Sequence, residues 1–139
     1  MNQLRSRVVG IESNGQIAVV DVESDGTRFT ATVLDAPSSA PYMTCGAEVV
    51  LMFKETEVSL AKNLAGQLSL RNIFPVRVRA VERGALISAV RLEYRGAMLT
   101  SVITTRAADA LQLAEGDRVD ALVKASEMML ASAEEAGRS

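Results

Sequence analysis

Residues 74–82 read Phe-Pro-Val-Arg-Val-Arg-Ala-Val-Glu, and their apolar and polar side chains alternate as in a half-buried β-strand. Seventy residues earlier, residues 5–12 read Arg-Ser-Arg-Val-Val-Gly-Ile-Glu, and the match between the two halves continues without a gap. In this register roughly fifteen positions of about sixty are identical, where chance gives about four. The identical pairs include Asn2 and Asn72, Glu12 and Glu82, Gly46 and Gly116, Lys54 and Lys124, and Leu60-Ala61 and Leu130-Ala131. The chain therefore consists of two copies of one small β unit.

Each copy is predicted to contain five short strands. After the first strand, the pattern predicts strands at 16–23 and 86–94, 27–34 and 97–104, 47–54 and 117–124, and 57–61 and 127–131. Asp25-Gly26 and Arg95-Gly96 predict tight hairpin turns. Before the fourth strand the copies diverge, because 106–113 has a helix-forming composition whereas 36–41 contains two prolines and predicts an irregular loop. The pattern indicates an all-β protein of two tandem OB-like five-stranded barrels.

The repeat predicts a first lobe at 1–64, a second lobe at 69–132 and a polar tail at 133–139. Lobes this small bury a low fraction of their surface, yet 48% of the residues are hydrophobic. The surplus of apolar surface predicts a homo-oligomer, a trimer whose six lobes mimic a hexamer, with a dimer as the alternative.

The composition argues against several functions. The net charge is −2, which gives no general reason to expect nucleic acid or an anionic membrane as a partner. The chain has no histidine and a single cysteine, Cys45, so we expect neither an enzyme, nor direct metal ligands, nor a disulfide. No apolar run approaches membrane-spanning length, and we expect a cytoplasmic protein.

Three segments of the second half combine groups that favour an anion. They are Ser69-Leu70-Arg71-Asn72 at a strand entrance, Val102-Ile103-Thr104-Thr105 before the helical turn, and Leu122-Val123-Lys124-Ala125-Ser126 at a strand end. Cations, hydroxyls and free amides together hold a compact oxyanion without protonating it. The second half is also the more basic, at +1 for residues 71–139 against −3 for residues 1–70.

These segments, in this order and with Glu82-Arg83-Gly84-Ala85 and Glu115-Gly116-Asp117 between them, resemble the molybdate-binding Mop family, also called TOBE domains. The tandem resembles the di-Mop arrangement of that family, and the resemblance covers nearly the whole chain. It implies a cytoplasmic, non-enzymatic protein that needs no cofactor and binds molybdate or tungstate for storage, buffering or sensing. It also implies oxyanion sites at subunit interfaces, lined by Ser69, Arg71, Asn72, Thr104, Lys124 and Ser126, with Lys54 as the first-repeat counterpart of Lys124.

The chain departs from the family pattern, mainly in the first repeat. There the counterpart of Ser-x-Arg-Asn begins only at Met1-Asn2, Leu34 replaces the threonine, and Glu55 follows Lys54. In the second repeat Ala107 stands where the family has a serine. These departures predict fewer complete sites than a symmetric di-Mop protein would have.

Other interpretations stay open at this point. Thr104 can serve only as a helix cap, Arg71 can pair with an acid, and Lys54 can be a solvated strand end. The sequence does not separate molybdate from tungstate or sulfate. A structural or regulatory interaction module, with the fold kept and the ligand lost, is the alternative function.

Overall fold

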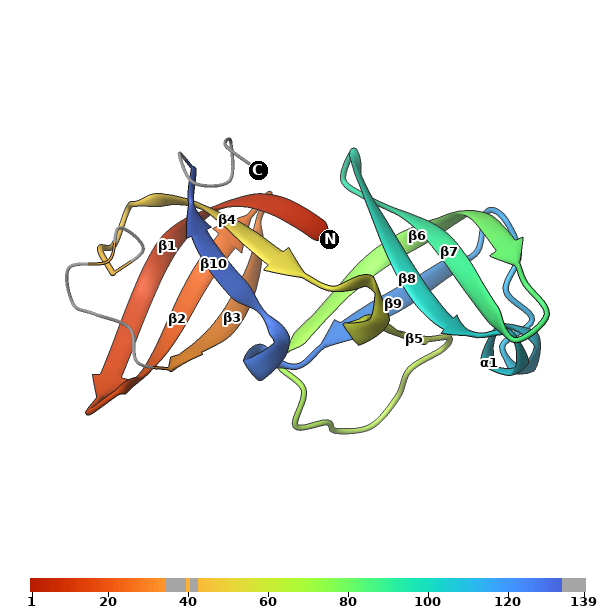
Figure 1. The fold of residues 1–139 in the computed structure, drawn as a ribbon, viewed down its shortest axis with the longest axis horizontal. Helices are drawn as coiled ribbons and strands as arrows, with labels where there is room; N and C mark the ends of the chain where they lie inside the picture. The colour runs from red at the N-terminus through yellow and green to blue at the C-terminus, as the bar shows by residue number, and fades with distance from the viewer. Residues whose placement is uncertain (35–39, 41–42, 134–139) are drawn as a thin grey trace. The chain divides into compact units, whose positions relative to one another are not determined.

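A computed structural model describes residues 1–34, 40 and 43–133, and they form two compact units that are almost entirely β (Figure 1). The first unit comprises Met1, Gln3–Phe53 and Lys124–Ser139, and the second comprises Asn2 and Lys54–Val123. The predicted all-β fold with two OB-like barrels is confirmed. The predicted loop at 36–41, apart from Ala40, and the predicted tail beyond Ala133 lie outside the described residues.

The first unit is a five-stranded sheet with the order β10-β4-β1-β2-β3. Its strands are β1 (Asn2–Asn14), β2 (Ile17–Ser24), β3 (Thr27–Leu34), β4 (Glu48–Phe53) and β10 (Met129–Ser132). The alternation along β2 places Val20 and Val22 in the core, and they share it with Phe29, Leu51 and Phe53. These side chains are fully buried, so the alternating pattern read from the sequence gives the inner face of the sheet.

The second unit repeats this arrangement with the order β5-β9-β6-β7-β8. Its strands are β5 (Ser59–Ala61), β6 (Asn72–Arg83), β7 (Ile87–Tyr94), β8 (Ala97–Thr104) and β9 (Arg118–Val123). The rings of Phe74 and Tyr94 meet edge to face in its core, with 5.4 Å between their centroids. The first long strand of each unit carries an irregularity at the same place, between Val8 and Gly10 and between Val78 and Ala80. The two units are therefore copies of one architecture.

The repeats exchange their last strands. The strand β10 of the second repeat pairs antiparallel with β4 of the first, and β5 of the first repeat pairs antiparallel with β9 of the second. Figure 1 shows β10 beside β4 and β5 beside β9. Each unit thus combines four strands of one repeat with the fifth strand of the other. The predicted lobes, 1–64 and 69–132, follow the sequence repeat, and the compact units differ from them by this exchange.

Short helices precede the fourth and fifth strands. The helix α1 (Thr105–Ala110) occupies part of the helical segment predicted at 106–113. The 3-10 helices η1 (Glu55–Glu57) and η2 (Ala125–Glu127) lie between the fourth and fifth strands of the two repeats. The chain changes direction at these helices, where it passes from one unit to the other.

A tight turn at Gly84 links β6 to β7. The Gly84 N–H donates to the Ile87 carbonyl at 3.0 Å, and the Thr105 hydroxyl donates to the Gly84 carbonyl at 2.8 Å. A Cβ at position 84 would lie well inside the contact distance of the Ile87 carbonyl oxygen. Gly10, by contrast, has room for a Cβ, with Asp21 at ordinary contact distances of 3.6 and 3.7 Å.

Gly84→Ala is expected to lower the free energy of unfolding by about 1–3 kcal/mol, because the turn must open to admit the methyl group. Urea denaturation followed by circular dichroism measures the loss. The control Gly10→Ala should change the unfolding free energy much less. Equal losses in the two variants would contradict this account of the turn.

Candidate functional site

The two repeated lysines have the same local structure. Lys54 follows β4 and caps η1 with φ −72° and ψ 147°, and Lys124 follows β9 and caps η2 with φ −64° and ψ 144°. Each lysine carbonyl accepts a hydrogen bond from the glutamate N–H three residues on, at 3.0 Å from Glu57 and 2.9 Å from Glu127. Both ammonium groups are exposed. Each helix therefore presents a cation and, two residues later, a hydroxyl.

Strand exchange places each lysine with the strands of the other repeat. The helix η1 packs against β8 in the second unit, whereas η2 packs against β3 in the first unit. The predicted site residues are therefore divided. Lys124 and Ser126 belong to the first unit, and the second unit holds Lys54, Ser69, Arg71, Asn72 and Thr104.

Ser69 and Arg71 are exposed at the entrance to β6. The Arg71 guanidinium donates to the carbonyl of Leu68, so it is held by the backbone rather than by an acid. It lines a cavity of about 500 Å³ together with residues of the preceding segment: Leu64, Gly66, Gln67, Leu68 and Ile73. Arg71 is the single charged residue among these lining residues, so the cavity wall is positive.

Asn72 is fully buried, unlike the other predicted site residues. Its counterpart Asn2 is also buried, and the Asn2 side-chain amide holds the backbone of Thr100 in the second unit. It donates to the Thr100 carbonyl and accepts from the Thr100 N–H, both at 2.8 Å. An asparagine at this repeat position therefore acts as an anchor for a strand.

Thr104 forms the N-cap of α1. Its hydroxyl accepts a hydrogen bond from the Ala107 N–H at 3.1 Å, which is the bond a capping threonine makes. The side chain is nevertheless exposed. Capping therefore occupies one lone pair of the hydroxyl oxygen and leaves its proton available to an acceptor.

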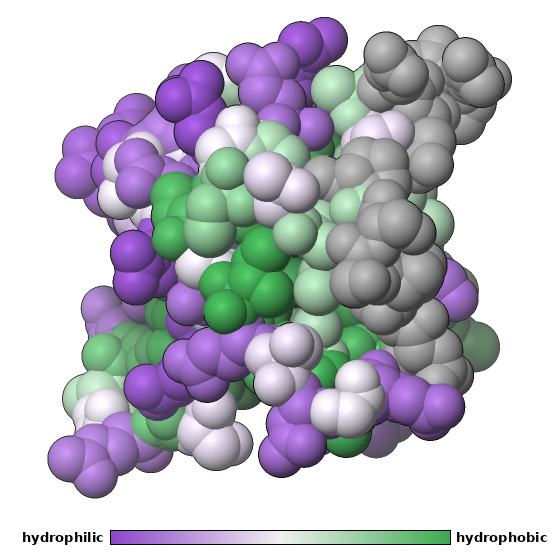
Figure 2. All heavy atoms as spheres, turned by 90° about the vertical axis from the view of Figure 1, so that its left-hand side faces the viewer, coloured by the Kyte–Doolittle hydropathy of each residue, from purple (hydrophilic) through white to green (hydrophobic). Residues whose placement is uncertain are grey.

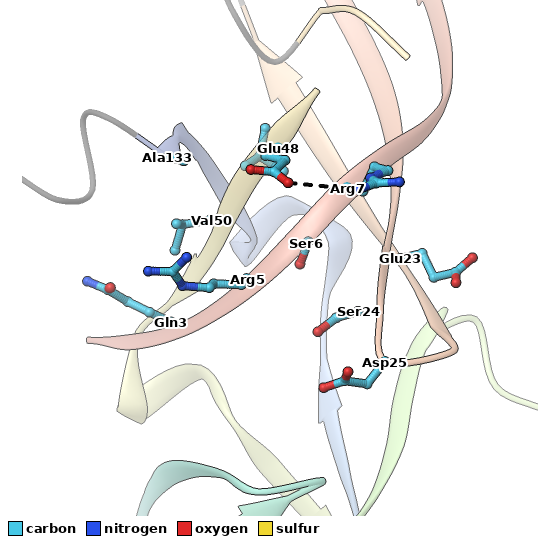
Figure 3. A pocket seen from close by; sticks show the side chains of 11 residues that line it. Gln3, Arg5, Ser6, Arg7, Glu23, Ser24, Asp25, Glu48, Val50 and Ala133 are labelled. Atoms are coloured by element: carbon cyan, nitrogen blue, oxygen red, sulfur yellow. Dashed lines mark ion pairs between the residues drawn. The ribbon is translucent and has the colours of Figure 1, made fainter. Parts of the chain in front are cut away.

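The first unit has a cavity of about 500 Å³ that the sequence did not predict (Figure 3). Arg5 and Arg7 line it, but Glu23, Asp25 and Glu48 line it as well. Arg7 and Glu48 approach to 3.8 Å and are largely exposed, which makes theirs a weak ion pair. Three carboxylates outnumber two guanidinium groups, so this cavity does not favour a dianion.

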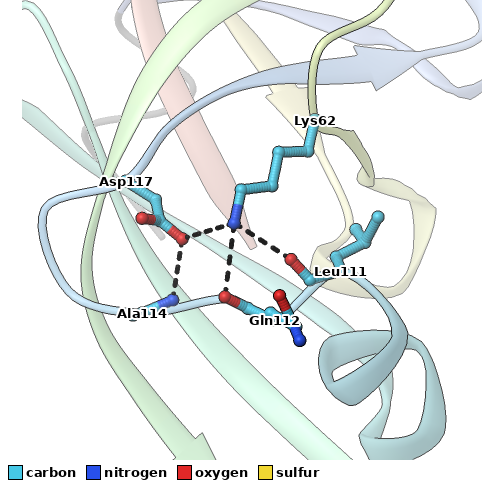
Figure 4. Close-up of polar contacts among 5 residues, drawn as sticks. All are labelled: Lys62, Leu111, Gln112, Ala114 and Asp117. Carbon is cyan, nitrogen blue, oxygen red and sulfur yellow. Dashed lines mark hydrogen bonds and ion pairs between the residues drawn. The ribbon is translucent and has the colours of Figure 1, made fainter.

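A second feature absent from the prediction is a polar cluster around Lys62, in the second unit (Figure 4). The Lys62 ammonium donates to the carbonyls of Leu111 and Gln112 at 3.0 and 3.3 Å, and to the Asp117 carboxylate at 3.1 Å. The same carboxylate oxygen accepts from the Ala114 N–H at 2.9 Å. Carbonyls at the end of a helix attract a cation, so Lys62 satisfies the C-terminus of α1.

The pKa of Asp117 lies below its ordinary value, first because of the hydrogen bond from the Ala114 N–H and second because of the hydrogen bond from Lys62. A carboxyl with a lowered pKa in the folded state stabilises the fold above its unfolded pKa. That stability is lost as the pH falls through the folded pKa.

Among the described residues, no three His, Cys, Asp or Glu side chains are grouped so that they could hold a metal ion. Within the same ranges, no helix has the length and apolar character of a membrane span.

Asp117→Asn is expected to flatten the loss of unfolding free energy below about pH 4, since the carboxyl that titrates is removed. Chemical denaturation from pH 7 to pH 2 measures the profile. Glu115→Gln, which removes an exposed carboxylate from the same loop, controls for the change in net charge. An Asp117→Asn profile as steep as the wild-type profile would contradict the stabilising role of this carboxylate.

Comparison with known proteins identifies relatives of this chain. The TOBE domain model matches residues 68–130. The chain is 35% identical over 129 residues to the molybdenum transport protein ModE of Herbaspirillum seropedicae, covering 84% of this chain and 48% of that protein. It is 32% identical over 133 residues to the molybdenum-pterin-binding protein MopA of Rhodobacter capsulatus, covering 94% of this chain and 50% of that protein. The chain thus spans about half the length of these two relatives.

A solved structure matches both repeats. The cytoplasmic molybdate-binding protein ModG, with molybdate bound, superposes with a TM-score of 0.88 at 29% identity, over 94% of this chain and 95% of that chain. The match extends over nearly the full length of both proteins, so it includes both repeats. With two such repeats in tandem, the chain belongs to the Mop/TOBE family of molybdate-binding proteins.

Proposed function

We propose that this chain is a cytoplasmic, non-enzymatic binding protein for molybdate, serving storage, buffering or sensing. The observation that carries the proposal is the likeness of both repeats to ModG, a cytoplasmic molybdate-binding protein. The chemistry of the candidate residues agrees with it. Molybdate is a tetrahedral dianion, and exposed ammonium, guanidinium and hydroxyl groups bind such an ion without proton transfer.

We infer direct contacts to the oxyanion from the exposed members of the predicted set: Lys54, Ser69, Arg71, Thr104, Lys124 and Ser126. The two lysines are the strongest candidates, since each lies two residues before an exposed hydroxyl, Thr56 or Ser126, on a repeated backbone. We assign buried Asn72 an indirect role, because it is the first residue of β6 and directly follows Arg71. Tungstate has the same charge and shape as molybdate, so these donors should bind it as well.

Lys124→Ala and Arg71→Ala are each expected to weaken molybdate binding by about 1.5–3 kcal/mol, the usual worth of a hydrogen bond to a charged group. Lys54→Ala should cost less, because Glu55 follows Lys54 whereas Ala125 follows Lys124. Isothermal titration calorimetry with molybdate, tungstate and sulfate measures affinity and stoichiometry.

Glu55→Ala is the matched test of this asymmetry, since it gives the first repeat the alanine of the second. It should strengthen binding at the Lys54 site. Equal losses for Lys54→Ala and Lys124→Ala would refute the asymmetry. Absence of molybdate and tungstate binding at micromolar concentration would refute the proposed function and favour an interaction module.

We also propose that the protein is a homo-oligomer, a trimer with a dimer as the alternative. Both units expose large apolar side chains around the second and third strands. These are Ile17, Val19 and Leu34 in the first unit, and Leu86, Ile87 and Met98 in the second. Figure 2 shows hydrophobic surface gathered near the middle of one face, with hydrophilic surface around it. Association of copies would remove such surface from water.

Leu86→Asp is expected to dissociate the oligomer, because Leu86 is 80% exposed in the single chain and a carboxylate there would oppose burial. Sedimentation velocity at several protein concentrations gives the mass. Gly84→Ala, which perturbs the same turn without adding a charge, controls for a change in local stability. A wild-type protein that stays monomeric at high micromolar concentration would overturn the oligomer proposal and leave the binding proposal untouched.

A further inference from the structure

The two exchanged strands are almost interchangeable. β5 contains Leu60-Ala61 and β10 contains Leu130-Ala131, and each pair faces its partner strand in the same register. Leu60 lies opposite Ala121 of β9, and Leu130 lies opposite Leu51 of β4. Backbone hydrogen bonds do not distinguish the two strands over the register that they share. The choice of which strand occupies which edge therefore depends on side chains, including those that flank the shared Leu-Ala pair.

Lys62 directly follows β5, and its side chain makes several specific polar contacts. Its ammonium lies 3.1 Å from the Asp117 carboxylate and also binds the Leu111 and Gln112 carbonyls. The side chains of Lys62 and Asp117 are 30% and 25% exposed, so the pair is partly shielded from water. An ion pair in such a place is stronger than one on an open surface.

In the pairing of β10 with β4, the positions equivalent to Lys62 and Asp117 carry no charge. Ser132, the last residue of β10, stands at the position equivalent to Lys62, and Ala47 precedes β4 where Asp117 precedes β9. The turns themselves are alike, because Ala47 and Asp117 each donate an N–H to the residue three before, at 3.1 Å in both units. Gly46 and Gly116 adopt φ values of 90° and 92°. The difference between the two edges therefore lies in the side chains rather than in the backbone.

We propose that the edge of β9 and the adjoining loop 111–117 form a docking surface for a strand followed by a lysine, and that Lys62 directs the first repeat's fifth strand to it. Four pairings of two strands with two edges are conceivable. Only β5 on β9 brings a lysine to an aspartate. If β5 instead folded back on β4, Lys62 would meet Ala47 and the Asp117 carboxylate would lose its cation. The ion pair thus favours exchange over closure of each repeat on itself.

The contacts of the loop support this assignment. The Ala114 N–H donates to the Asp117 carboxylate and fixes its position. The carbonyls of Leu111 and Gln112, just after α1, accept from the Lys62 ammonium (Figure 4). The docking surface therefore offers three acceptors to one ammonium group, at a position where β10 would bring only a serine hydroxyl.

Disulfide reporters in the full-length chain test the proposal, in a Cys45→Ser background. Ala61 lies opposite Asp120 in the exchanged pairing, and repeat symmetry places Ala61 opposite Val50 in the self-closed pairing. The pair Ala61→Cys and Asp120→Cys therefore reports exchange, and the pair Ala61→Cys and Val50→Cys reports self-closure. With Lys62 and Asp117 intact, we expect an oxidised monomer from the first pair and only a trace of disulfide from the second.

Lys62→Ser, the residue of the second repeat, should raise the self-closed or intermolecular disulfide by about tenfold, the change expected from losing one charged hydrogen bond. Asp117→Asn should act in the same direction while its amide oxygen keeps the bond from Ala114. Moving the acceptor with Asp117→Ala and Ala47→Asp should make the self-closed disulfide predominate. Glu115→Ala, in the same loop, should leave the wild-type pattern unchanged.

Covalent dimers from the first pair after Lys62→Ser would show that a second copy supplies the strand once the ion pair is lost, which also supports the proposal. Yields of the two disulfides that stay at the wild-type values in all of these variants would overturn it. The experiment contains no oxyanion, so its outcome is independent of the proposed molybdate binding.

Discussion

The backbone hydrogen bonds of the exchanged fifth strands are the constraint on which the rest of the structure depends. An unpaired strand edge is a liability, and a short strand has too little side-chain surface to hold itself in place. The exchanged strands cover these edges, because β5 pairs with β9, the fourth strand of the second repeat, and β10 pairs with β4, the fourth strand of the first repeat. Each repeat has its sheet completed by the other, so the duplicated sequence behaves as one folding unit rather than as two independent domains.

The exchange also decides where the anion-binding chemistry lies. The segments that carry Lys54 and Lys124 lie between the fourth and fifth strands, so each is carried across when the fifth strand is exchanged. As a result the second unit gathers Lys54 with Ser69 and Arg71, although the sequence repeat groups those residues with Lys124. A motif read along one repeat therefore does not describe one site. The candidate oxyanion donors of the second unit therefore come from both repeats.

Much of the fold could be predicted from the sequence, because local signals determine it. The alternation at 74–82 gives β6, and Asp25-Gly26 gives a turn whose Asp25 adopts φ 47°. The cap at Thr104 was also within reach, since a threonine before a helical segment commonly accepts a backbone N–H. The exchange of the fifth strands could not be predicted from the sequence. The Leu-Ala pair shared by β5 and β10 fits the edge of β4 as well as the edge of β9. The contact between Lys62 and Asp117 spans 55 positions, and no periodicity links them.

Surface charge, rather than backbone, is where the repeats have diverged. At three equivalent positions an acid of the first repeat is an arginine in the second: Asp21 and Arg91, Asp25 and Arg95, and Glu48 and Arg118. The second unit is therefore the more positive surroundings for an anion. In that unit, however, Glu55 directly follows Lys54. Screening in salt reaches about 8 Å, so exposed charges beyond that distance contribute little at a site, whereas a neighbour in the chain acts almost unscreened. Glu55 directly follows Lys54 in the chain, so its carboxylate opposes an anion bound at that lysine. The lysine in the more acidic unit, Lys124, keeps the better immediate surroundings for a dianion.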